Sequence, residues 1–161
     1  MVDQLMIDNW QGRVKEKDTI LHLGDLIMGR NSDYFDWLAE LPGQKFLVMG
    51  NHDNRKPEWY KKHRFTVIEP FSLTYNGVEV SFSHYPIRTL RRAQISVFGH
   101  CHNNPVNFLT SSHINMSVEL RHFCPQDVKY LINKIIQSFG RSGDENFGPI
   151  KKKKNKGAIH S

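Results

Sequence analysis

The sequence predicts an α/β protein whose strands form two mixed sheets. Helical patterns alternate with short apolar runs in the first half of the chain, and β-prone runs cluster in the second half. This mixture favours sheets flanked by helices over a helical bundle or an all-β sandwich. A length of 161 residues suits one domain and is enough to bury a sizeable core.

The first half of the chain is predicted to alternate between helices and strands. Apolar residues at near-helical spacing predict a helix that begins close to Met1. Ser32 is the expected N-cap of a second helix that ends before Pro42, and Pro57 opens a short third helix. The apolar runs "DTILHL" and "KFLVMG" between these helices are predicted to be buried strands.

Turn and strand signals dominate the second half. The Asn76-Gly77 pair separates the β-prone runs "TVIEPFSLTY" and "VEVSFSH", and such a pair is the strongest short signal for a hairpin. The segments "ISVFGH" and "HINMSVEL" are predicted to be further strands. The last helix is expected to run from Pro125 to Gly140.

The net charge of +6 is concentrated near the C-terminus, because the residues from 141 onward include six basic side chains and only two acidic ones. We expect a folded domain over residues 1–139 and a disordered basic tail over 140–161. The stretch Lys151–Lys156 is a candidate contact for nucleic acid or another polyanion, and a solvated tail without a dedicated partner is the simpler interpretation.

The sequence carries no feature of an exported or membrane-bound protein. Its two cysteines are too few for a disulfide framework, and no apolar run is long enough to span a membrane. The start of the chain does not resemble a signal peptide. We therefore expect a cytoplasmic protein.

Polar side chains follow four of the predicted strands. They are Asp25 in "HLGDL", Asn51, His52 and Asp53 in "VMGNHD", His84 in "SFSHYP", and His100 and His102 in "VFGHCHN". Because ligands of open α/β sheets gather at the carboxyl ends of strands, we expect these groups to meet. Their mixture of oxygen and imidazole ligands suits Mn²⁺, Fe or Zn²⁺ better than Ca²⁺ or Mg²⁺.

The same segments resemble the calcineurin-like metallophosphoesterases, especially their small bacterial and phage branch. The resemblance rests on Gly24-Asp25, "GNHD" at 50–53, His84 and "GHCH" at 99–102, which occur in the family's order and strand context. It implies a four-layer α-β-β-α sandwich with two mixed sheets. It also implies hydrolysis of a phosphomonoester or phosphodiester at a dinuclear metal site, with Mn²⁺ favoured and Fe or Zn²⁺ as alternatives.

Each metal ligand is assigned by its position in the family pattern. Asp25 would bridge two ions. Asn51, His84 and His100 would complete the shell of one ion, and His102 would bind the other.

The resemblance also assigns residues that face the substrate. His52 would contact the phosphoryl group or protonate the leaving oxygen, and Asp53 would orient His52 and keep it protonated. Asn51 would contact the substrate as well as a metal. From its position beside the motifs, Arg88 is a further candidate for binding phosphate oxygens, because an arginine fork matches their geometry.

One part of the family pattern has no match in this sequence. The family begins with a strand that ends in D-x-H, whereas Met1 here falls within the predicted first helix. The first strand is therefore expected to be missing, either because the chain is truncated or because it is a genuine short form. The second metal keeps only Asp25 and His102, so we expect an incomplete second site and impaired activity.

His22 is the obvious substitute for the missing ligands, but side chains alternate along a strand, so it should diverge from Asp25. We interpret His22 as a strand histidine with a local partner. A catalytically weakened metal-binding remnant or subunit, and a nucleic-acid-binding protein that uses the basic tail, stay open as alternative functions.

Overall fold

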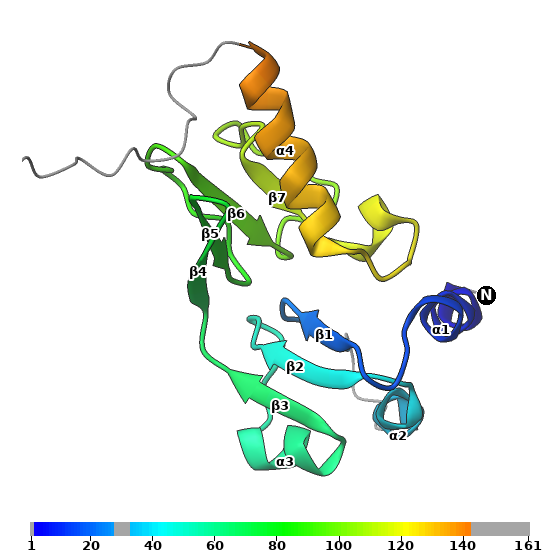
Figure 1. Cartoon of the computed structure of the whole chain (residues 1–161). Helices are drawn as coiled ribbons and strands as arrows, with labels where there is room; N and C mark the ends of the chain where they lie inside the picture. The colour runs from blue at the N-terminus through cyan, green and yellow to red at the C-terminus, as the bar shows by residue number, and fades with distance from the viewer. Residues whose placement is uncertain (1, 28–32, 143–161) are drawn as a thin grey trace, which may run out of the picture.

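The computed structural model describes residues 2–27 and 33–142, whose strands form two sheets (Figure 1). Sheet A has the order β1-β2-β3, and sheet B has the order β4-β5-β6-β7. The strands are β1 (Thr19–His22), β2 (Gln44–Val48), β3 (Phe65–Ile68), β4 (Phe71–Tyr75), β5 (Val78–Phe82), β6 (Gln94–Phe98) and β7 (His113–Asn115). Sheet B is mixed as predicted, because β4 alone is antiparallel to its neighbour, whereas the described strands of sheet A are all parallel.

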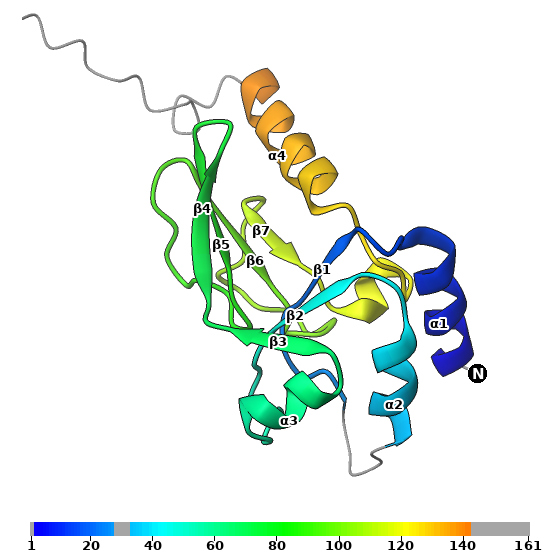
Figure 2. The ribbon, with the colours of Figure 1, turned by 60° about the horizontal axis from the view of Figure 1, so that its bottom comes forward.

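Helices flank both sheets, which confirms the predicted α/β class. They are α1 (Val2–Arg13), α2 (Asp33–Glu40), α3 (Pro57–Lys62), the 3₁₀ helix η1 (Val118–Arg121) and α4 (Val128–Ser142). Helices α1, α2 and α3 lie on the side of sheet A away from sheet B, whereas α4 lies along sheet B (Figures 1 and 2). No helix in the described ranges is long and apolar enough to cross a membrane.

Alternate side chains of sheet A face different layers of the molecule. On one face, Leu47 packs in a cluster with Phe35 of α2 and Tyr60 of α3. On the other face, Val48 joins Leu23 in the larger core shared with sheet B. The parallel strands of sheet A therefore lie between two apolar layers, as a buried sheet requires.

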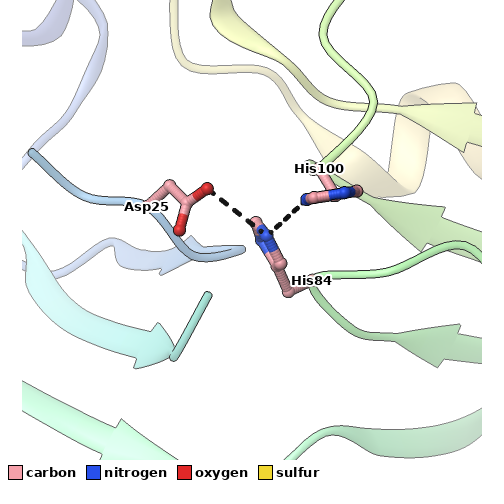
Figure 3. A group of neighbouring side chains, drawn as sticks. All are labelled: Asp25, His84 and His100. Carbon is pink, nitrogen blue, oxygen red and sulfur yellow. Dashed lines mark hydrogen bonds and ion pairs between the residues drawn. The ribbon is translucent and has the colours of Figure 1, made fainter. Parts of the chain in front are cut away.

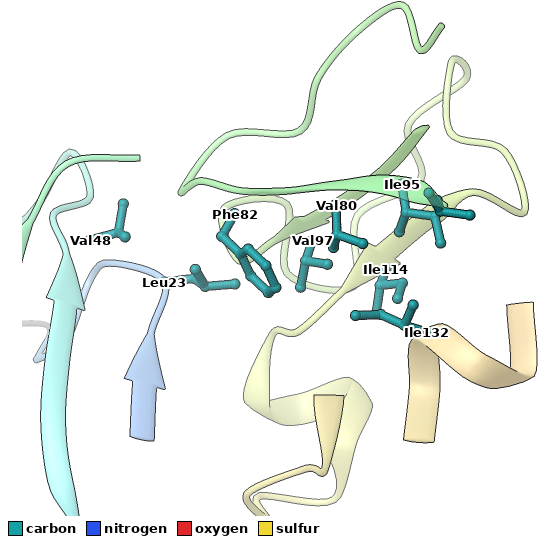
Figure 4. Close-up of a cluster of buried hydrophobic side chains, with 9 residues drawn as sticks. Leu23, Val48, Val80, Phe82, Ile95, Val97, Ile114 and Ile132 are labelled. Atoms are coloured by element: carbon teal, nitrogen blue, oxygen red, sulfur yellow. The ribbon is translucent and has the colours of Figure 1, made fainter. Parts of the chain in front are cut away.

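Sheet B has one apolar face and one polar face. Val80 and Ile95 belong to the larger core, which also contains Ile132 of α4 (Figure 4). Helix α4 thus packs against the same face of sheet B that meets sheet A. On the opposite face, Ser96 is fully buried beneath the loop after β5, where its Oγ accepts the N–H of Ile87 at 3.1 Å.

The hairpin is confirmed, but the run before it is split. Asn76 and Gly77 both have positive φ, at 50° and 78°, as a tight two-residue hairpin turn requires. The predicted single run "TVIEPFSLTY" instead forms β3 in sheet A and β4 in sheet B. Pro70 lies at the break, because proline cannot donate to a strand ladder.

Two predicted elements have other bounds in the structure. Only the first three residues of "HINMSVEL" form a strand, and the chain then turns into η1. Helix α4 begins three residues after Pro125, where the Asp127 carboxylate accepts the N–H of Tyr130 at 3.1 Å and caps the first turn. It continues past Gly140 to Ser142. The predicted cap Ser32 and the tail from residue 143 onward lie outside the described residues.

Candidate metal centre

The segments that follow β1, β2, β5 and β6 meet at the junction of the two sheets, as predicted. Asp25 reaches this point from sheet A, and His84 and His100 reach it from sheet B (Figure 3). One ligand atom from each of the three lies within 4.8 Å of the others. We call these three residues the metal cluster.

His84 lies at the centre of the metal cluster and is almost fully buried. Its Nε2 is 3.4 Å from Asp25 Oδ2, 3.0 Å from His100 Nδ1 and 3.0 Å from Asn51 Oδ1. Its Nδ1 is 2.7 Å from the carbonyl oxygen of Leu23. Because a carbonyl only accepts, Nδ1 carries a proton, and Nε2 is the ring nitrogen that faces the other groups.

The donor set fits a divalent transition metal. A carboxylate oxygen, an amide oxygen and two imidazoles converge on one point. A cation there would offset the repulsion between these closely spaced acceptor atoms. Burial, reinforced by the nearby imidazole of His84, lowers the pKa of His100, although Asp25 opposes this effect. A lowered pKa favours the neutral imidazole that binds metal.

Two glycines allow the metal loops to approach each other. Gly24 has φ +90°, and a Cβ there would collide with His84 and with the backbone of Gly50. A Cβ on Gly50 would collide with Asp25 and His84. Only glycine therefore permits this packing of the two loops.

Asp53 has a different role from the predicted one. Its buried carboxylate accepts the backbone N–H groups of Asp25 (2.7 Å), Leu26 (3.1 Å) and Gly50 (2.8 Å), and the Tyr60 hydroxyl lies 3.5 Å away. These bonds direct both oxygens into the protein. Asp53 therefore ties the two loops of sheet A together, and none of these bonds involves the imidazole of His52.

His52 and Arg88, the predicted substrate-facing residues, are both exposed. The backbone N–H of His52 donates to Asp25 Oδ1 at 2.8 Å, which fixes its position next to the metal cluster. The guanidinium of Arg88 lies 5.5 Å from the ring centroid of Phe108, which is on the loop between β6 and β7. That contact gives Arg88 an aromatic partner that does not belong to the metal cluster.

His102 is not part of the metal cluster. Its Nδ1 lies 2.8 Å from a carboxylate oxygen of Glu119 in η1. Burial alone would raise the pKa of Glu119, but hydrogen bonds from its own backbone N–H and from His102 hold it below the usual value. Sequence reasoning missed Glu119, because nothing in its local sequence indicates that η1 returns to the "GHCH" segment.

The local partner predicted for His22 is not found at its Nδ1. Its Nδ1 is buried and makes no hydrogen bond within the described parts of the chain. Burial lowers the pKa of this imidazole, although the nearby carboxylates of Asp53 and Asp25 partly oppose the effect.

Tyr85 is a second residue at the site that sequence reasoning missed. Its hydroxyl donates to Asn51 Oδ1 at 3.1 Å, and its ring centroid lies 4.4 Å from that of His100. The side chain is 52% exposed. Its position directly after the predicted ligand His84 was the one available signal.

The family comparison agrees with this geometry. The model of the calcineurin-like phosphoesterase family matches residues 3–146, which is most of the chain. The chain belongs to this family. Membership implies metal-dependent phosphoester hydrolysis, and Asp25, His84 and His100 form a metal-binding group that agrees with it.

The individual relatives extend the fold comparison without naming an activity. An uncharacterized protein of Methanocaldococcus jannaschii is 29% identical over 143 residues, which covers 83% of this chain and 75% of that protein. The gene 66 protein of a Mycobacterium phage is 34% identical over 58 residues, or 34% of this chain and 29% of that protein. A crystal structure of a protein of unknown function from Aquifex aeolicus aligns with a TM-score of 0.65 at 25% identity, covering 83% of this chain and 84% of that one.

Proposed function

We propose that this protein is a metal-dependent phosphoesterase that hydrolyses a phosphomonoester or a phosphodiester. The observation that carries the proposal is the metal cluster of Asp25, His84 and His100 in a chain of the calcineurin-like family. Asn51 adds an amide oxygen 3.0 Å from His84 Nε2. This donor set supports Mn²⁺ first, with Fe or Zn²⁺ as alternatives.

The protein's own residues would hold and orient the substrate. Divalent ions supply the charge that stabilises the phosphoryl oxygens and activates water for attack. His52 is fixed by its backbone bond to Asp25 and exposes its imidazole, so it is the proposed proton donor to the leaving oxygen. Asn51 is the proposed contact of both metal and substrate. Arg88 keeps a weaker proposed role in phosphate binding.

A second ion would be held by Asp25 and His102. The bond to Glu119 uses Nδ1 of His102, so its Nε2 is the ring nitrogen that would bind the metal. In this arrangement an outer carboxylate orients a histidine ligand. We further propose a cytoplasmic location and contact between the Lys151–Lys156 stretch and a polyanion, on the basis of composition alone.

A metal-binding protein with weak catalysis is the second candidate. It is favoured by one observation: within the described ranges, three ligands gather only at Asp25, His84 and His100. A single tightly bound ion would then serve a structural or subunit role with slow turnover.

One experiment separates the candidates. We would measure the metal content of the purified protein and its hydrolysis of bis-p-nitrophenyl phosphate with added Mn²⁺, in the wild type, Asp25→Asn and His84→Ala. The exposed His122→Asn is the control, because asparagine accepts the left-handed backbone at that position.

The proposed phosphoesterase should turn over with bound Mn²⁺, and both ligand variants should lose metal and activity while the control keeps both. One ion per chain without turnover would favour the second candidate. A wild type that binds no divalent metal would overturn both.

A further inference from the structure

A mainly apolar pocket of about 330 Å³ adjoins the metal cluster. Its walls include Met49 after β2, Ile68 and Pro70 at the crossing between the sheets, and His84 and Tyr85 after β5. The volume falls in the range of small-molecule sites, which begins at about 300 Å³. Because His84 belongs to both the metal cluster and the pocket wall, the pocket lies directly beside the metal centre.

Tyr85 lines the pocket and also contacts the metal cluster. Its ring centroid lies 4.4 Å from that of His100 and 4.8 Å from that of His84, and its hydroxyl donates to Asn51 at 3.1 Å. Although it lines the pocket, its side chain is 52% exposed. A ligand bound at the metal cluster and extending into the pocket would pass over this ring.

The segment that carries Tyr85 is held in place without a ligand. Ser83 Oγ donates to the carbonyl oxygen of Tyr85 at 2.7 Å. Two residues later, Ile87 is bonded on both sides: its N–H donates to Ser96 Oγ at 3.1 Å, and its carbonyl lies 2.8 Å from His113 Nε2. A ring presented this way loses little freedom when a ligand packs on it.

We propose that Tyr85 and this pocket bind an aromatic ring in the ester group of the substrate, such as a nucleobase, while the phosphate occupies the metal centre. An aromatic ring stacks on tyrosine and fills an apolar pocket, whereas a short alkyl group does neither. Tyr85 is then a specificity-determining residue. The inference rests on the proposed function and adds the class of substrate.

Phosphonates test the pocket without hydrolysis, because their carbon–phosphorus bond replaces the ester. Calorimetry on the Mn²⁺-loaded protein would compare the dissociation constants of phenylphosphonate and methylphosphonate, which share a head group. We expect the phenyl compound to bind about tenfold more tightly, as one stacked ring provides.

Three variants assign the preference to the ring of Tyr85. Tyr85→Leu should bring the two dissociation constants close together. Tyr85→Phe keeps the ring and loses only the hydroxyl, so the preference should persist. Tyr130→Leu removes an equally exposed tyrosine from α4, outside the pocket, and should also keep it.

The two ligands distinguish failure of the pocket from failure of the proposed function. Equal binding of both phosphonates by the wild type, or a preference that survives Tyr85→Leu, would overturn the pocket and leave the metal centre in place. If methylphosphonate binding does not depend on Mn²⁺, the proposed function fails and the inference fails with it.

Discussion

At the scale of single residues, Asp53 and His52 are neighbours with separate roles. Asp53→Ala would leave the N–H groups of Asp25, Leu26 and Gly50 without their acceptor. We expect a loss of about 2–4 kcal/mol in the free energy of unfolding, because buried donors lose a charged partner.

His52→Ala should instead change stability by less than about 0.5 kcal/mol, since its side chain is exposed, and should reduce turnover. Urea unfolding of the metal-free variants measures the difference. An Asp53→Ala protein as stable as His52→Ala would contradict the observed role of Asp53.

Glu119 gives a prediction about the second ion. Glu119→Ala removes the acceptor that orients His102, so the affinity for a second Mn²⁺ should fall about tenfold while the first ion binds as before. Glu119→Gln keeps an acceptor oxygen and should lose less. Electron paramagnetic resonance of a Mn²⁺ titration separates the two binding events, and an equal loss for both ions would count against this role.

The residues of the metal cluster were predictable, and their neighbours were not. Asp25, His84 and His100 each follow a strand end, so local pattern and order along the chain indicated a common site. Tyr85 and Glu119 matter because of contacts made after folding, and no spacing encodes those contacts. Likewise, the sequence placed Asp53 beside His52, but the direction of its carboxylate depends on the backbone N–H groups around it.

At the scale of elements, the sequence predicted the features that depend on neighbouring residues alone. The Asn76-Gly77 turn is fixed by the left-handed backbone of two residues and was recognised directly. The transfer of the chain from sheet A to sheet B at Pro70 depends on which sheet each half can pair with. Helix α4 passes Gly140, because a single glycine costs only about 1 kcal/mol and does not end a helix.

Strand β1 contains a destabilising residue, which gives a pH-dependent prediction. Burial lowers the pKa of His22, although Asp53 and Asp25 oppose it in part. Below the ordinary histidine pKa of about 6.5, the unfolded chain binds a proton that the folded chain resists, so stability falls as pH decreases.

His22→Leu should weaken this pH dependence and raise the free energy of unfolding at neutral pH by about 1 kcal/mol, because the buried Nδ1 has no partner. Urea unfolding of the metal-free protein on either side of pH about 6.5 measures both effects. The exposed His122→Asn should keep the wild-type slope, and an unchanged slope in His22→Leu would refute the prediction.

At the scale of the whole molecule, the metal centre joins the two sheets. Asp25 and Asn51 follow strands of sheet A, whereas His84 and His100 follow strands of sheet B. The core beneath them, with Leu23 from sheet A against sheet B, is a further link. An ion held by ligands from both sheets should therefore favour the folded arrangement of the entire domain.

Metal binding is thus expected to stabilise the fold as a unit. A ligand that binds only the folded state adds about 2.7 kcal/mol at a concentration 100 times its dissociation constant. Mn²⁺ should raise the urea midpoint of the wild type, whereas His84→Ala should show no rise, because it removes the imidazole at the centre of the metal cluster. An equal rise in the variant would mean that Mn²⁺ stabilises the protein elsewhere.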